Sequence, residues 1–289
     1  MPEPDAALRD AERQGSRYVL ASPQRVQSGL AGAQLANRAG TSTEFMDYRE
    51  YQPGDDIRRI DWSAYARSDR LTVKLYREEV SPHVELVLDG SQSMDLTGTD
   101  KAAGAWAMAA LLATAAASAG FTHRLWLAGD QLELREPGRT RPGQWRAAGL
   151  TATVALPELL RRGAPSWRPR SLRVLVSDLL WPDDPQPILR RLLDSAAGLI
   201  VVQVLAREDT APPEVGNMEL IDAETGQTRE LFIDAAAQER YQRTLATHEA
   251  NWQGACQRLG AVMSRFVAED LLTDWNMRPL VEARVLRVS

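Results

Sequence analysis

The pattern that most constrains the fold is a strand-like run that ends in Asp-x-Ser-x-Ser. Residues 84–88 are largely apolar, and Asp89, Ser91 and Ser93 follow at once. Such a run is typical of a strand buried in a sheet. The strand would bring one carboxylate and two hydroxyls to the carboxyl edge of the sheet, where open α/β folds bind their ligands. We therefore expect a functional site at this edge.

Two later segments supply further oxygen atoms. Thr151 precedes a helical-looking stretch, and Asp178 ends a second apolar run, residues 172–178. None of these ligands is His or Cys, so the set suits Mg²⁺ (or Mn²⁺) and does not suit Zn²⁺ or a redox metal. Mg²⁺ takes about six oxygens and gives up its waters reluctantly. Two serines and a threonine at the ion, two aspartates holding its waters and one open position meet that demand.

Individual hydroxyls and turns allow other interpretations. Ser91 and Ser93 could instead cap the helix that follows them. Thr153 could supply the hydroxyl in place of Thr151. Asp130, preceded by Gly129 between two expected strands, looks like part of an ordinary hairpin turn.

The order of these residues (Asp-x-Ser-x-Ser, then Thr, then Asp after a strand) resembles the metal-ion-dependent adhesion site of von Willebrand factor A domains. The resemblance implies that the hydroxyls of Ser91, Ser93 and Thr151 contact the ion. It also implies that Asp89 and Asp178 act mainly through water. A carboxylate of a partner protein would then take the open position.

From residue 84 onward, strand and helix patterns alternate. This predicts an α/β fold of three layers, with a mainly parallel sheet covered on both faces. A β-hairpin is expected at 219–232, with its turn near Gly226, and Gly260 is expected to end the longest helix. The expected strands are 84–88, 123–128, 131–135, 172–177, 199–205 and 261–267; the expected helices are 101–119, 153–162, 187–197, 234–259 and 277–286.

Composition excludes several classes of protein. The net charge of −5 in 289 residues argues against a nucleic-acid-binding protein. Cys256 is the only cysteine, so no intrachain disulfide can form, and the acidic N-terminus lacks a signal sequence. Lys74 and Lys101 are the only lysines. Residues 102–120 are mostly alanine and fit a core helix better than a membrane span, so we expect a soluble, cytoplasmic chain without direct membrane insertion.

A charged block before the first long strand resembles the signature of the bacterial domain of unknown function 58 family. It runs from Glu44 to Trp62 (EFMDYREYQPGDDIRRIDW) and continues with Ala66-Arg67 and Glu78-Glu79; Asp222-x-Glu-Thr-Gly226 also falls where the family places it. The resemblance implies a von Willebrand factor A-like domain after a small β-containing segment. Family members are often encoded beside MoxR-type AAA+ ATPases, thought to assemble or activate other proteins. The expected domains are a helical or irregular segment at 1–37, the signature segment at 38–82 and the A-like domain at 83–289.

The charged block allows two interpretations. Its arginines (Arg49, Arg58, Arg59 and Arg67) can pair with its aspartates (Asp47, Asp55, Asp56 and Asp61), and Trp62 could anchor the cluster in apolar surface. The cluster would then brace the signature segment against the A-like domain. It could instead be a docking surface for the ATPase.

For function, we expect a non-enzymatic, Mg²⁺-dependent protein-binding module that works with a MoxR-type ATPase, or with a client protein that offers an Asp or Glu. The alternative is a hydrolase with Ser91 or Ser93 as nucleophile. A nucleophile elbow needs Gly-x-Ser-x-Gly, and both glycines are missing here. A phosphatase of the haloacid dehalogenase kind needs Asp-x-Asp, but Ser91 stands in the second position. A phosphate-binding loop ending in Gly-Lys-Ser/Thr is also missing.

Overall fold

A computed structural model of the chain describes residues 4–21, 45–53, 55, 57–76, 82–163, 165–211, 214–223 and 226–289. The chain divides into a larger unit, Met1–Pro23 with Pro82–Ser289, and a smaller one, Gln24–Ser81. The expected boundary at residue 82 lies close to the observed one. The expected separate segment at 1–37 is not observed as such, because helix α1 (Pro4–Gly15) packs into the core of the larger unit.

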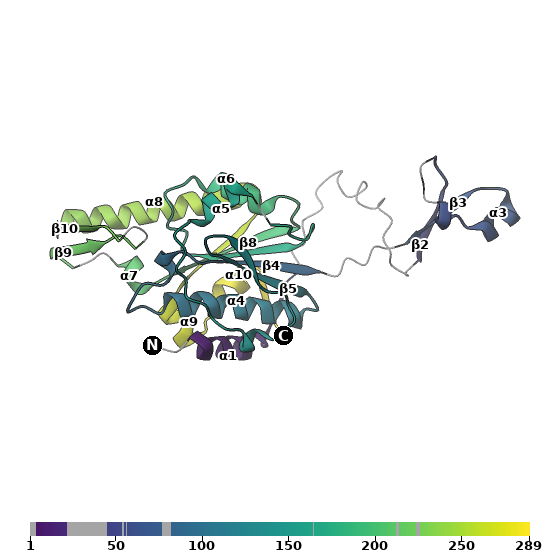
Figure 1. Cartoon of the computed structure of the whole chain (residues 1–289). Helices are drawn as coiled ribbons and strands as arrows, with labels where there is room; N and C mark the ends of the chain where they lie inside the picture. Colours follow the sequence, from purple (N-terminus) through teal and green to yellow (C-terminus); the bar gives the residue numbers. More distant parts are fainter. Residues whose placement is uncertain are drawn as a thin grey trace. The chain divides into compact units, whose positions relative to one another are not determined.

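The larger unit is built on one six-stranded sheet with the order β11-β8-β7-β4-β5-β6 (Figure 1). Its strands are β4 (His83–Asp89), β5 (Thr122–Ala128), β6 (Leu132–Glu136), β7 (Leu172–Ser177), β8 (Gly198–Leu205) and β11 (Val262–Val267). Neighbouring strands are parallel except for β6, which runs antiparallel to β5 at one edge. The expected mixed α/β fold with a mainly parallel sheet is confirmed.

Helices cover both faces of this sheet (Figure 1). Leu86 and Leu88 point into one buried cluster, with α1 and α4, whereas Val87 points into the other, with α5, α6 and α8. This alternation is the period of two that a strand imposes on its side chains. The remaining helices are α4 (Lys101–Ser118), α5 (Leu156–Arg162), α6 (Pro185–Leu193), α7 (Arg207–Thr210), α8 (Ala235–Leu259), α9 (Ala268–Asp274) and α10 (Arg278–Glu282).

The alanine-rich helix α4 lies in the core, between the sheet and α1, as expected. Small side chains let neighbouring elements approach closely. A Cβ on Gly104 would lie only 2.7 Å from the Cβ of Ala268 in α9, so glycine is required there. Within the described residues, no helix has the length and apolar character needed to cross a membrane.

The longest helix, α8, has the boundaries that the sequence indicates. The carboxylate of Asp234 accepts a hydrogen bond from the backbone N–H of Ala237 and caps its start. Gly260 ends it in the left-handed region, with φ 70°. The hairpin is also confirmed: β9 (Gly216–Ile221) pairs antiparallel with β10 (Thr228–Ile233).

The expected helix at 277–286 is wrong in its second half. Helix α10 covers Arg278–Glu282, and the chain then forms strand β12 (Leu286–Val288). This strand pairs antiparallel with β1 (Tyr18–Leu20), near the other end of the chain. The pairing gives the backbone of β12 hydrogen-bond partners that a local helical pattern does not reveal.

The smaller unit contains the antiparallel pair β2 (Phe45–Glu50) and β3 (Thr72–Tyr76), a short 3₁₀ helix (Ile57–Arg59) and helix α3 (Trp62–Ser68). Arg49 pairs with Asp55 at 2.7 Å, as expected. Asp61 caps α3 and pairs with Lys74 at 3.3 Å. Gly54, Asp56, Glu78 and Glu79, and the side chains of Asp47 and Arg59, lie outside the described residues.

Trp62 is exposed within the smaller unit, and its anchoring in apolar surface stays a prediction. Its side chain is 61% exposed, and its ring meets Tyr65 edge-on, because α3 buries none of its residues.

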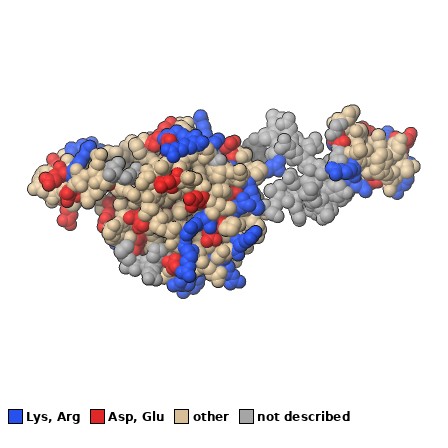
Figure 2. Space-filling model, in the orientation of Figure 1, with Lys and Arg blue, Asp and Glu red and all other residues tan. Residues whose placement is uncertain are grey.

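On the face of the molecule shown in Figure 2, acidic and basic side chains are interspersed over the larger unit.

Candidate metal site

Three distant segments meet at the carboxyl edge of the sheet. Strands β4 and β7 are neighbours, so Asp89 at the end of β4 lies beside the segment that carries Asp178. Ser91 forms a parallel bridge with Ala152, and the N–H of Ala152 donates to the carbonyl of Gly90 at 2.8 Å. The structure therefore brings the backbone of the Asp-x-Ser-x-Ser loop beside the segment that carries Thr151, and Asp89 beside the segment that carries Asp178.

This place is also where the strand order reverses. From β4 the chain builds outward through β5 and β6 on one side, and through β7, β8 and β11 on the other. A reversal of this kind separates the loops that follow the two central strands and opens a crevice for ligands.

Glycine is required at position 90, because the loop after β4 passes close to the end of β5. Its N–H donates to the carbonyl of Ala128 in β5 at 3.1 Å. A Cβ at this position would lie 2.7 Å from that same carbonyl oxygen, a separation that real Cβ atoms do not show. The glycine thus lets the loop turn tightly after Asp89.

Ser177 links the two aspartate segments. Its hydroxyl donates to Oδ2 of Asp89 at 2.7 Å and accepts from the N–H of Leu179 at 2.9 Å. Oδ1 of Asp89 accepts from the N–H of Ser91 at 3.1 Å. Each oxygen of Asp89 already accepts a hydrogen bond from the protein, an arrangement that suits a carboxylate acting on an ion through water.

The serine hydroxyls are not used as caps. Ser91 precedes a short 3₁₀ helix (Gln92–Met94) but makes no side-chain capping bond, and the N-cap of α4 is Asp100. The hydroxyl oxygens of Ser91 and Ser93 lie 3.1 Å apart. The simpler capping interpretation therefore does not account for these two residues, whose oxygens gather at the crevice.

The structure separates the roles of Thr151 and Thr153. Thr153 gives both its N–H, at 2.9 Å, and its hydroxyl, at 3.1 Å, to Oδ1 of Asp130. These bonds lower the pKa of Asp130, the backbone bond most. Asp130 therefore does more than form a hairpin turn: it holds the threonine segment beside the sheet. Thr151 is exposed, on the other side of the bridging Ala152.

The buried position of Asp89 makes its charge costly. Its side chain is completely buried. Burial first, and repulsion from Asp178 second, raise the pKa of Asp89 to about 7, against the bonds from Ser177 and Ser91 that lower it.

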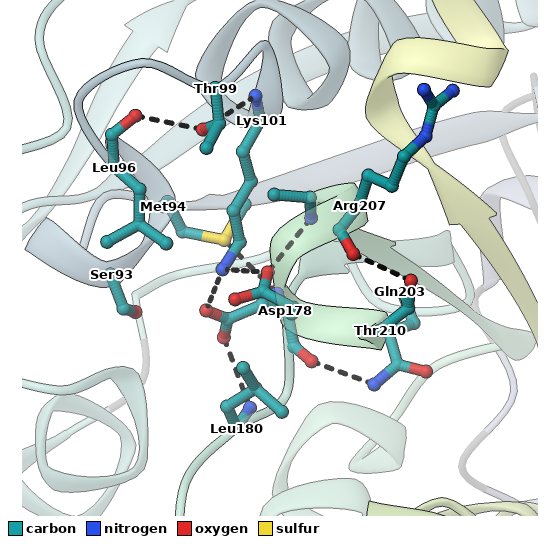
Figure 3. Close-up of polar contacts among 12 residues, drawn as sticks. Ser93, Met94, Leu96, Thr99, Lys101, Asp178, Leu180, Gln203, Arg207 and Thr210 are labelled. Atoms are coloured by element: carbon teal, nitrogen blue, oxygen red, sulfur yellow. Dashed lines mark hydrogen bonds and ion pairs between the residues drawn. The ribbon is translucent and has the colours of Figure 1, made fainter. Parts of the chain in front are cut away.

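Asp178 is held by an ammonium group that the sequence analysis did not assign to the site. Nζ of Lys101 lies 2.8 Å from Oδ2 of Asp178 (Figure 3). It also lies 2.8 Å from Oδ2 of Asp209 in α7. Burial lowers the pKa of Lys101, but the two carboxylates outweigh it and raise the pKa above its ordinary value. The sequence offers no motif that pairs Lys101 with Asp178.

The backbone after Asp178 is strained and firmly held. Leu179 is completely buried and lies in the left-handed region with φ 59°, which is uncommon for a residue with a side chain. Its carbonyl lies 2.6 Å from Nε2 of His248 in α8. The backbone carbonyl of Asp178 accepts a hydrogen bond from the side-chain amide of Gln203 at 2.9 Å. The backbone N–H of Asp178 contacts the sulfur of Met94 at 3.1 Å. Backbone strain of this kind persists where surrounding contacts fix it, and it is common at binding sites.

The donor set fits a hard divalent cation. In the described part of the chain, His, Cys, Asp and Glu side chains do not gather in groups of three or more that could hold a metal ion. A metal at this edge would therefore depend on hydroxyl oxygens together with two carboxylates. Such ligands suit Mg²⁺ and Mn²⁺.

The fold and this edge define a class: an α/β protein with a mainly parallel sheet and hydroxyl and carboxylate oxygens at its switch point. Residues 47–251 match the family described as Protein of unknown function DUF58, and the chain belongs to this family. Uncharacterized proteins of Mycobacterium bovis and Mycobacterium tuberculosis are each 30% identical over 291 residues, covering 94% of this chain and 88% of their own.

Two solved structures share weaker likenesses. A conserved hypothetical protein, BatB, from Bacteroides thetaiotaomicron aligns with 70% of this chain and 98% of its own, at 10% identity and a TM-score of 0.36. An aerotolerance-related membrane protein from Bacteroides fragilis aligns with 70% of this chain and 99% of its own, at 13% identity and a TM-score of 0.38. Scores this low define no shared fold, so the description above stands on the strand order itself.

Proposed function

We propose that this protein is a Mg²⁺-dependent protein-binding module of the von Willebrand factor A type and catalyses no reaction itself. The observation that carries the proposal is the meeting of Ser91, Ser93 and the two aspartates at the switch point of the sheet. The strand order, with its one antiparallel edge strand, supports the same type of domain.

In this proposal, Ser91, Ser93 and Thr151 would hold the ion directly, and Asp89 and Asp178 would hold its waters. A bound ion would supply affinity for a carboxylate of the partner protein. The chain's own contribution is to orient these segments: Ser177 and the N–H of Ser91 orient Asp89, and Asp130 holds the threonine segment in place.

A MoxR-type AAA+ ATPase, or its client, is the partner we propose, and the cytoplasm is where we expect them to meet. This part of the proposal depends on the family resemblance. Co-purification with and without a metal chelator tests it: we expect an ATPase or an acidic client to be retained only while divalent metal is present. Equal retention in chelator would contradict the metal-dependent contact.

A hydrolase mechanism finds no support in the described contacts. A serine nucleophile needs a general base within hydrogen-bonding reach. The three histidines of the chain are engaged elsewhere: His83 contacts Thr122 at the amino end of β4, His123 packs on Trp145, and His248 contacts the carbonyl of Leu179. In the part of the chain that the structure describes, none of them hydrogen-bonds to Ser91 or Ser93.

The metal itself is tested by thermal unfolding in Mg²⁺. A ligand that binds only the folded state stabilises it, by about 2.7 kcal/mol at one hundred times its Kd. We expect Mg²⁺ to raise the Tm of the wild type and to leave that of Asp89→Ala unchanged. Asp10→Ala removes a carboxylate from an exposed pair on α1 and serves as the matched control, which should respond like the wild type. A full response in Asp89→Ala would eliminate the site.

A further inference from the structure

The proposed site contains, besides its oxygen atoms, the buried ammonium group of Lys101. The side chain of Lys101, the first residue of helix α4, has no solvent exposure and pairs with Asp178. Its Nζ lies 2.8 Å from a carboxylate oxygen of Asp178 and 2.8 Å from one of Asp209. Asp178 belongs to the proposed metal site, and Asp209 does not.

Asp209 is positioned independently of the lysine. Its Oδ2 accepts the N–H of Ala206 at 2.9 Å, and its carbonyl accepts the hydroxyl of Tyr241 from α8 at 2.7 Å. The carboxylate is therefore a fixed acceptor, with a side chain that is only 11% exposed. The ammonium of Lys101 can therefore stay paired with Asp209 when it does not pair with Asp178.

A divalent cation bound near Asp178 must compete with this ammonium. Both positive groups draw on the same carboxylate, and they repel each other in a buried region where charges are weakly screened. Asp209 reduces this conflict, because it offers the ammonium a second negative charge. Removing the lysine and removing Asp209 should therefore change the affinity for the ion in opposite directions.

We propose that Lys101 is a tethered competitor of the metal ion, and that Asp209 is the acceptor toward which it withdraws when the ion binds. Together they set the affinity of the site for divalent cations. The inference rests on the proposed function, because it concerns the same site. A purely structural ion pair would instead make both substitutions destabilising, without opposite effects on metal affinity.

Calorimetric titration of the full-length chain with MgCl₂ alone tests the inference. We expect Lys101→Met to bind Mg²⁺ about tenfold more tightly than the wild type, and Asp209→Asn about tenfold more weakly, a difference of about 1.4 kcal/mol in each case. Asp270→Asn is the matched control, because it removes an exposed carboxylate that pairs with Arg207 beside Asp209. This control should keep the wild-type Kd within about twofold.

The double variant, Lys101→Met with Asp209→Asn, separates a specific contact from the general effect of charge. If Asp209 acts through the lysine, Asp209→Asn should weaken binding far less when Lys101 is already methionine. Equal effects in both backgrounds, or changes in the same direction for the two single variants, would overturn the inference.

The titrations distinguish failure of the proposed function from failure of this inference alone. Absence of Mg²⁺ binding in folded wild type and in the folded variants rejects the metal site, and the inference with it. Binding that none of these substitutions alters rejects the inference alone. Should Lys101→Met fail to fold without metal, Asp209→Asn still decides, since unchanged or tighter binding in that variant contradicts the competition.

Discussion

At the scale of single residues, the site depends on buried polar atoms whose partners come from distant parts of the chain. The hydroxyl of Ser177 joins Asp89 to Leu179, and the carbonyl of Leu179 meets His248. A left-handed residue with a side chain costs roughly 1–2 kcal/mol. These bonds compensate that cost and fix the direction in which Asp178 leaves the sheet.

His123 provides a pH-dependent test of the buried polar groups. Its ring is 8% exposed, packs on Trp145 and faces His83; its Nε2 has no hydrogen-bond partner within the described residues. Burial first, and His83 second, lower the pKa of His123 below its ordinary 6.5. Below about pH 6.5, His123 takes up a proton in the unfolded chain but resists it in the folded protein. The contribution of His123 to the free energy of unfolding is therefore complete above pH 6.5 and is lost as the pH falls.

Replacing His123 with phenylalanine removes this proton while keeping a ring on Trp145. We expect the free energy of urea unfolding to fall less steeply from about pH 7 to pH 5 in His123→Phe than in the wild type, by at most about 1.4 kcal/mol per pH unit. Identical slopes in the two proteins would show that the histidine does not contribute to acid sensitivity.

The sequence predicts the residues of the site that stand at strand ends, and misses those that reach it from elsewhere. Asp89 and Asp178 each follow an apolar run, and the parallel register of their strands places them at one edge. Lys101 and Asp209 enter through helices, and no local pattern indicates which way a helix-terminal side chain turns. Their contribution became visible only from the packing of α4 and α7.

At the scale of elements, helix α1 shows how a segment far from the sheet in sequence becomes part of its core. Ala7, Leu8 and Ala11 recur on one face and are buried against α4. A Cβ on Gly15 would lie 2.7 Å from the carbonyl oxygen of Leu111 in α4, so the two helices approach closely at this point. This packing explains why the N-terminal helix belongs to the larger unit.

Truncation of Leu8 tests that assignment. Because the side chain is completely buried, Leu8→Ala should lower the free energy of unfolding of the larger unit by about 2–5 kcal/mol. Arg9→Ala, at the exposed neighbouring position, should change it by no more than about 0.5 kcal/mol. Equal and small effects in chemical denaturation would mean that α1 contributes nothing to the core.

Elements with strong local signals were predictable, and elements defined by distant pairing were not. The apolar strand patterns predicted the strands of the six-stranded sheet to within a few residues. Gly260 predicted the end of α8. Strand β12 (Leu286–Val288) pairs with β1 across the length of the chain, and the sequence analysis expected no strand there; the expected helix ran on to residue 286. A three-residue strand buries too little surface to leave a recognisable pattern of its own.

At the scale of the whole molecule, the order of the strands determines where a ligand can bind. The alternation of strands and helices predicts a parallel sheet but does not give its order. In the structure, β4 and β7 are the central neighbours, and the loops after them leave in different directions. The proposed site occupies this reversal.

Diffraction from crystals soaked in Mn²⁺, recorded for its anomalous signal, measures directly whether one cation unites the three segments. We expect an ion close to the hydroxyl oxygens of Ser91 and Ser93, at about the 2.1 Å typical of such contacts, with the ammonium of Lys101 moved toward Asp209. A saturated crystal with no signal at the carboxyl edge of β4, or with the ion bound elsewhere on the surface, would contradict a metal-dependent binding module.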